Sequence, residues 1–226
     1  MRRILVFTGV LVVGFAAFAA PAILLQVGFA GGYRGSNLAA LGVVQLVLVG
    51  AVVAAGLRML GLRFSDIGFA SRRWRRDALL GAAVAAAWAA LQFGWLFPAT
   101  GGASREDIAG ILALVDGRWI NVLWYLPLGI LGGGVTEELY FRGFLITALR
   151  DILATVPGAA AIAGTCSVLF FALGHLPADW VDWMDIVIPG AAYVALFLGT
   201  GRLTAPMFAH GLWNATAVAG IHLLYG

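Results

Sequence analysis

The sequence predicts an all-α membrane protein: a bundle of about seven transmembrane helices (six to eight) in a single integral membrane domain, residues 1–226. Three observations predict this class. Charged residues make up 11% of the chain and hydrophobic residues 62%, whereas soluble domains contain about 25% charged residues. The mean hydropathy is +0.96. Finally, seven apolar stretches approach or exceed the length of about 20 residues that a helix needs to cross a bilayer.

The predicted spans follow one another with short connections. The first begins after Met1-Arg2-Arg3, and its apolar run is too long for the core of a signal peptide, about 7–15 residues, so we interpret it as an uncleaved span. The fourth is long enough to be tilted or to project from the bilayer, and the sixth is short and contains Pro189. The seven spans fall near residues 4–30, 37–57, 78–98, 119–149, 158–175, 184–201 and 204–224.

The arginines predict the orientation of the chain. With a cytoplasmic N-terminus, eleven of the fourteen basic residues lie on inner connections and span ends, and only Arg34, Arg105 and Arg118 lie outside. This asymmetry follows the positive-inside rule. One inner connection, residues 58–77, is amphipathic and could lie on the anionic leaflet, although a plain positive-inside anchor explains it equally well and is favoured. The net charge of +3 is therefore topological, and no nucleic-acid partner is expected.

Two adjacent carboxylates lie inside the fourth apolar stretch. Glu137 and Glu138 cannot face the same way on an α-helix, whereas Glu138 and Arg142 share a face at i,i+4 and can neutralise each other as an ion pair. Glu137 is left without a local partner. A free carboxylate in hydrocarbon is expensive and marks a functional site by default, although the triplet alone is equally compatible with a structural network between helices.

Two further polar clusters lie downstream in apolar stretches. Phe171 precedes His175 by one helical turn, and His210 precedes Asn214 by one turn. Each cluster has a structural alternative, an interfacial histidine in the first case and interhelical hydrogen bonding in the second. Together they offer imidazoles for proton transfer and a carboxamide that can donate to a developing oxyanion. Cys166 is the only cysteine, which excludes an internal disulfide and a multi-cysteine metal site.

These three clusters, in their order and spacing, resemble the motifs of the CAAX prenyl protease and bacteriocin-processing (CPBP, or Abi) family of intramembrane glutamate proteases. The resemblance covers the catalytic-motif half of the chain, residues 119–220. It implies that Glu137 with His175 activates a water that attacks a peptide carbonyl. It further implies that His210 and Asn214 stabilise the oxyanion, and that supporting residues hold the site together, namely Glu138, Arg142 and Phe171.

A divalent metal such as zinc is a possible cofactor, and its ligands would be His175, His210 and Glu137. The His-Glu-x-x-His helix motif of many zinc proteases is absent, so a metal-free glutamate mechanism is favoured. Straight helices raise a difficulty, because they would place His175 near the outer end of its span and His210 only about 9 Å from the inner end. Convergence on Glu137 then requires tilted, broken or short helices.

The sequence therefore predicts an intramembrane endopeptidase that acts on a membrane-associated protein or peptide. The expected location is the plasma (inner) membrane of a bacterium, as a multi-pass protein in the lipid bilayer. The alternative is a non-catalytic membrane protein, either an immunity or binding scaffold or a proton or ion pathway that uses the same polar cluster. No repeated halves typical of transporters are evident, which favours the enzyme.

Overall fold

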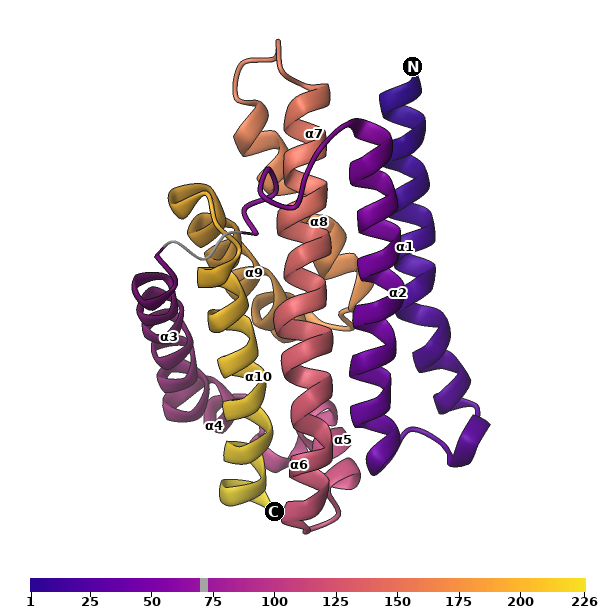
Figure 1. The fold of residues 1–226 in the computed structure, drawn as a ribbon. Helices are drawn as coiled ribbons and strands as arrows, with labels where there is room; N and C mark the ends of the chain where they lie inside the picture. The colour runs from indigo at the N-terminus through magenta and orange to yellow at the C-terminus, as the bar shows by residue number, and fades with distance from the viewer. Residues whose placement is uncertain (70–72) are drawn as a thin grey trace.

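A computed structural model describes residues 1–69 and 73–226, and within these ranges the chain forms helices and no strand. The all-α class is thus confirmed. Helix α1 (Arg2–Gln26) and helix α2 (Ser36–Leu60) form an antiparallel hairpin (Figure 1), joined by a turn that contains the short helix η1 (Phe29–Gly31). Gly28 and Gly32 in this turn have φ of 92° and 94°, which glycine adopts readily because it lacks a Cβ atom.

The next helix is continuous and apolar, and it contains a short π-helical segment. Helix α3 (Trp74–Leu91) runs through a π-helical segment, η2 (Gln92–Leu96), into α4 (Phe97–Ala99). After the turn η3 (Gly102–Ser104), the amphipathic helix α5 (Glu106–Val115) lies at the end of the molecule that also holds the C-terminus (Figure 1). The prediction for residues 58–77 extends over Arg72, which lies outside the described residues.

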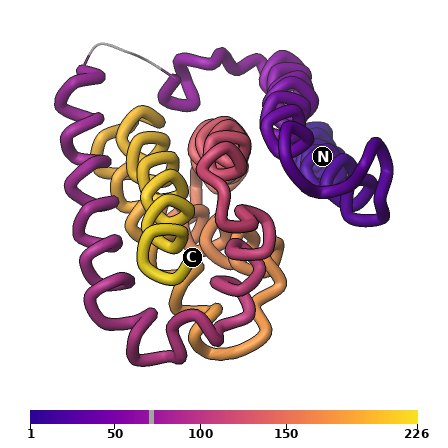
Figure 2. Tube along the Cα trace, turned by 90° about the horizontal axis from the view of Figure 1, so that it is seen from below, coloured from indigo at the N-terminus to yellow at the C-terminus, as the bar shows by residue number. Residues whose placement is uncertain are grey.

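The central element is a 34-residue helix, Trp119–Ile152. It consists of α6 (Trp119–Pro127), the π-helix η4 (Leu128–Ile146) and α7 (Thr147–Ile152). Viewed along its axis it lies between the α1–α2 hairpin on one side and α10 on the other, with α3 outside α10 (Figure 2). The predicted long fourth span is therefore the axis of the bundle. Its side chains are buried in the main hydrophobic core, most completely at Tyr140, Phe144 and Ile146.

The last three helices are α8 (Ala159–Gly174), α9 (Trp180–Thr200) and α10 (Thr204–Tyr225). Helix α8 has only 16 residues, about 24 Å, so the turn to α9 stops well short of the lower end of the molecule (Figure 1). Asp179 caps α9 by accepting hydrogen bonds from the backbone N–H groups of Val181 (2.7 Å) and Asp182 (3.0 Å). The short helix brings this turn to the middle of the bundle.

Five helices in the described residues are long and apolar enough to cross a membrane: Arg2–Gln26, Ser36–Leu60, Trp74–Ala99, Trp119–Ile152 and Trp180–Thr200. Of the other two predicted spans, α8 is shorter than this length, and α10 has 22 residues but carries polar side chains along its course. Large apolar side chains such as Leu5, Val12, Leu79 and Leu223 are exposed on the outside of the bundle. The chain is a multi-pass membrane protein, and its apolar exterior is the surface that faces lipid.

An ion pair closes the end of the bundle near the N-terminus. The guanidinium of Arg202, between α9 and α10, donates to both carboxylate oxygens of Asp77 on α3, at 2.5 Å and 2.6 Å. These hydrogen bonds raise the pKa of Arg202. The bidentate geometry fixes α3 against the start of α10.

Candidate functional site

The π-helix η4 carries the two glutamates and brings two other helices into close contact with them. Thr136 Oγ1 donates to the carbonyl oxygen of Leu131, five residues back, at 2.6 Å. Most π-helical segments are single turns and many mark functional sites, and η4 extends over 19 residues. Its glycines face different neighbours. A Cβ atom on Gly132 would lie 2.7 Å from Gln45 Oε1 of α2, and one on Gly134 would lie 2.7 Å from the Cα atom of Gly211 on α10.

Glu138 is the centre of a buried charged cluster. Its Oε1 atom lies 3.1 Å from Arg142 Nη1 and 2.8 Å from His210 Nδ1. Glu138 and Arg142 have no exposed surface, and His210 is 6% exposed. The predicted Glu138–Arg142 ion pair is therefore present, and His210 is a third member that the sequence did not place there. A carboxylate can only accept, so His210 Nδ1 donates this bond and Nε2 points away from Glu138.

Aromatic rings complete the surroundings of Arg142. Its guanidinium carbon lies 4.3 Å from the ring centroid of Phe171 and 5.5 Å from that of Tyr193, and its Nη2 donates to the carbonyl oxygen of Gly190 at 3.3 Å. Stacking on aromatic faces partly replaces the hydration that a buried guanidinium loses. The Tyr193 ring also stacks on His210, with centroids 4.8 Å apart and planes 20° apart.

Glu137 faces a different space from Glu138. Together with His175 it lines a cavity of about 150 Å³ whose other walls come from α1, α2 and α8. Glu137 Oε2 is buried, accepts no hydrogen bond from the described residues, and lies 3.9 Å from His210 Nε2. His175 Nδ1 hydrogen-bonds the carbonyl oxygen of Phe171 at 2.8 Å, which leaves Nε2 available. The prediction that Glu137 lacks a local partner is thus confirmed.

His210 and Asn214 converge on one point of η4. A Cβ atom on Gly133 would lie 3.3 Å from His210 Nε2 and 2.3 Å from Asn214 Nδ2, so both nitrogen atoms lie beside the Gly133 backbone. Asn214 Nδ2 donates to the carbonyl oxygen of Gly129 at 2.9 Å. Stabilisation of an oxyanion requires two donors aimed at one point, which the Asn214 amide and a protonated His210 Nε2 would supply.

The short α8 resolves the difficulty that straight spans posed. His175 follows the last residue of α8, and the chain turns at Leu176, whose φ of 53° is uncommon outside glycine. Because this turn lies in the middle of the bundle, His175 reaches the cavity of Glu137. His210 lies near the N-terminal end of α10, and its Nε2 is 3.9 Å from Oε2 of the same carboxylate. All seven predicted site residues therefore belong to one continuous region.

Several members of this region were missed. Tyr193 and Gly190 on α9 contact the charged cluster, and Phe15, Phe18 and Gln45 on the first two helices line the cavity of Glu137. Of these residues, Gln45 could have been found from the sequence, because it is an isolated polar residue within an apolar span. It donates to the carbonyl oxygen of Phe18 at 3.1 Å. For Tyr193 no local pattern distinguishes it from an ordinary core aromatic.

The possible metal ligands do not form a metal-binding group. Among residues 1–69 and 73–226, no three His, Cys, Asp or Glu side chains are arranged to hold a metal ion, and this includes Glu137, His175 and His210. The donor set in this geometry does not fit a three-ligand zinc site.

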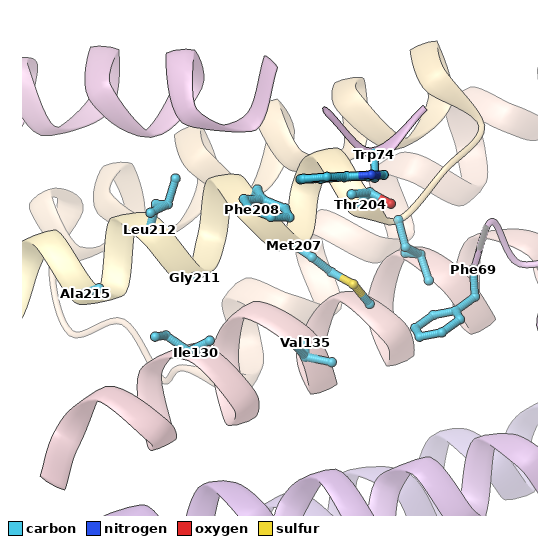
Figure 3. Close-up of a pocket in the computed structure, with 11 residues that line it drawn as sticks. Phe69, Trp74, Ile130, Val135, Thr204, Met207, Phe208, Gly211, Leu212 and Ala215 are labelled. Carbon is cyan, nitrogen blue, oxygen red and sulfur yellow. The ribbon is translucent and has the colours of Figure 1, made fainter. Parts of the chain in front are cut away.

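A larger apolar groove, of about 580 Å³, lies between η4 and α10 (Figure 3). Ile130 and Val135 from one helix and Met207, Gly211 and Leu212 from the other line it. None of the seven predicted site residues lines this groove. Beside it, Gly134 of η4 packs closely against Gly211 of α10. The largest hollow is thus apolar and distinct from the polar site.

The fold and site define a class: a multi-pass helical membrane protein with a carboxylate, histidine and arginine cluster inside its bundle. Residues 119–216 match the family model described as type II CAAX prenyl endopeptidase Rce1-like. This match supports the CAAX protease family that the three motifs predicted. No curated protein and no solved structure matches the chain.

Proposed function

We propose that the protein is an intramembrane endopeptidase that hydrolyses a peptide bond in a membrane-associated protein or peptide. The observation that carries the proposal is the different environment of the two glutamates. Glu138 is bound by Arg142 and His210, whereas Glu137 presents a free oxygen to a cavity that it shares with His175. The family match over residues 119–216 supports the same reaction class.

In the proposed mechanism Glu137, assisted by His175, takes a proton from a water molecule in their cavity. The water oxygen bonds to the substrate carbonyl carbon, and the C–N bond breaks as the proton passes to the leaving amine. A carboxylate without a bound cation is a better proton acceptor than one held in an ion pair, which favours Glu137 over Glu138 as the base.

His210 and Asn214 are the proposed oxyanion donors. The hydrogen bond from His210 Nδ1 to Glu138 fixes the ring, so that Nε2, when protonated, and the Asn214 amide can donate to the same oxygen near Gly133. Glu138 and Arg142, with Phe171 against the guanidinium, act as positioning residues for this imidazole.

We further propose that α8 and α10 complete seven membrane crossings in one domain, residues 1–226, with a cytoplasmic N-terminus in a bacterial plasma membrane. An odd number of crossings agrees with the termini lying at opposite ends of the bundle (Figure 1). Arg3 at the start of α1 is ion-paired with Asp151 in α7, so Arg2, Arg3 and Arg150 lie at the same end of the bundle, as the positive-inside rule requires. Residues 119–220 are the motif-bearing half, and α1 and α2 supply walls of the catalytic cavity.

The test compares protein termini in membranes of cells that carry the wild type, Glu137→Gln, or Glu106→Gln. Glu106 is exposed at the start of α5 and provides a matched control with the same loss of charge. A terminus present with the wild type and the control but absent with Glu137→Gln establishes proteolysis and identifies a substrate. Equal termini in all three, at equal protein levels with candidate substrates expressed, would favour the binding scaffold or ion pathway.

The same assay decides between a metal-free mechanism and zinc. Because the three predicted ligands do not form a metal-binding group, we expect cleavage to survive prolonged dialysis against a chelator. Loss of cleavage that zinc restores would assign a metal instead.

A further inference from the structure

A second polar cavity, of about 180 Å³, lies between α5, α9 and α10, and Asn214 forms part of its wall. Its polar lining residues are Gln92, Asp107, Tyr125, Asp185 and Asn214. It shares none of its lining residues with the cavity of Glu137 and His175. At about 30 Å³ per molecule, its volume corresponds to about six waters.

The polar side chains that line this cavity differ in exposure. The Asp107 side chain, at the start of α5, is 46% exposed, and the Asp185 side chain is 16% exposed. Gln92 is only 1% exposed. The most exposed of these three, Asp107, lies in the first turn of α5, at the end of the molecule that holds α4 and α5 (Figure 1), so the cavity opens there.

Arg105 neutralises the carboxylates near the mouth. Its guanidinium is ion-paired with both Asp107 and Asp185. Burial alone would lower the pKa of Arg105, but the hydrogen bonds to the two carboxylates raise it above its ordinary value. A charged network at the edge of an apolar bundle is more stable where water has access.

Gln92 shows that the protein alone does not satisfy this cavity. Its Nε2 donates to Asp185 Oδ1 at 2.7 Å, but its Oε1 is buried and accepts no hydrogen bond from the described residues. A buried carbonyl oxygen without a donor is destabilising. If these side chains only held η2, α5 and α9 together, Gln92 Oε1 would remain without a donor. Water in the cavity would donate to it.

The cavity reaches one of the two proposed oxyanion donors, Asn214. Asn214 lines the cavity with one side and contacts the backbone of η4 with its amide nitrogen, 2.9 Å from the Gly129 carbonyl oxygen. His210 is four residues, about 6 Å of helix, from Asn214, and its Nε2 lies beside the same Gly133 backbone.

We propose that this cavity is a water route that leads from the α4–α5 end of the molecule to Asn214. This inference rests on the proposed function: the route would supply the one water molecule that each peptide-bond hydrolysis consumes. The water would pass Asn214 to reach Glu137, so the route is separate from the apolar groove of Figure 3.

The first experiment measures hydration without using activity. In a Cys166→Ser background, which removes the exposed native thiol, Ala217→Cys probes the cavity and Ala87→Cys probes a neighbouring apolar pocket on α3. The full-length variants in lipid vesicles are treated with methanethiosulfonate ethylammonium added to both sides. Because the thiolate is the reactive form and an apolar site suppresses it, we expect Ala217→Cys to react about tenfold faster or more.

Equal rates at the two positions would overturn the proposal and leave the assignment of Glu137 untouched. The second experiment fills the cavity with Ala217→Leu and the control pocket with Ala87→Leu. We expect a lower kcat at an unchanged KM for the first variant only. Fast labelling of Ala217→Cys with unchanged kcat in a folded Ala217→Leu would show a hydrated cavity that is not the route, and this too would overturn the proposal.

Discussion

The buried pair Glu138–Arg142 gives the sharpest test of how the site is held together. Both side chains have no exposed surface, and their charged atoms are 3.1 Å apart. Replacing Arg142 by Met keeps much of the volume but leaves a buried carboxylate with His210 as its one remaining ion-pair partner among the described residues. Removing one member of a buried pair costs about 3–5 kcal/mol.

The magnitude converts to an observable change in melting temperature. For a chain of this size 1 kcal/mol corresponds to about 2–4 °C, so we expect Arg142→Met to lower the Tm by about 6–20 °C. The double variant Glu138→Gln/Arg142→Met removes both charges and should recover part of this loss. The resulting coupling energy should lie in the upper part of the range of about 0.5–3 kcal/mol that contacting residues show.

Thermal unfolding of the purified protein in detergent, followed by circular dichroism, measures Arg142→Met, Glu138→Gln and the double variant. The control is Arg3→Met, which breaks an ion pair with Asp151 whose side chains are 59% and 36% exposed. Exposed pairs contribute about 0–1 kcal/mol, so the control should melt close to the wild type. If Arg142→Met also melts within 1 °C of the wild type, or if the single effects add without coupling, the cluster does not stabilise the fold as reasoned.

Three further predictions concern close contacts and stacking. A Cβ atom on Gly42 would stand 2.6 Å from the backbone of α6, whereas Gly50 on the same helix has nothing within 4 Å, so Gly42→Ala should lower the Tm and Gly50→Ala should not. A Cβ atom on Gly133 would lie 2.3 Å from Asn214 Nδ2, so Gly133→Ala would displace this amide and should reduce cleavage about 10- to 100-fold in the terminus assay; unchanged cleavage would remove Asn214 from the oxyanion site. Tyr193→Phe keeps the ring that stacks on the imidazole and should retain activity, whereas Tyr193→Leu should lose it, and equal activity of the two would show that the stacking has no positioning role.

The proposed catalytic site combines two demands that conflict in a membrane. A base must keep one carboxylate free, while lipid surroundings favour neutralising every charge. The protein separates these demands between adjacent residues. Glu138 carries the structural ion pair, and Glu137 faces a cavity that includes His175 and the polar side chain of Gln45.

Local patterns in the sequence determined the class of the protein and much of the site. Composition and apolar run length require a helical membrane protein, because every backbone polar group in lipid must be bonded within its own segment. The i,i+4 spacing of Glu138 and Arg142 predicted their ion pair, and the same reasoning left Glu137 unpaired. These features depend on neighbours along the chain, so the sequence suffices for them.

The tertiary structure alone decided how the separate motifs meet. The short α8 stops in the middle of the bundle and brings His175 to Glu137, and the π-helical pitch of η4 with its glycines lets α2 and α10 approach. It also placed Tyr193 on His210 and gave α1 and α2 a share of the cavity wall. None of these contacts has a signature in local spacing, because each depends on where two distant helices end and how closely their backbones can pack.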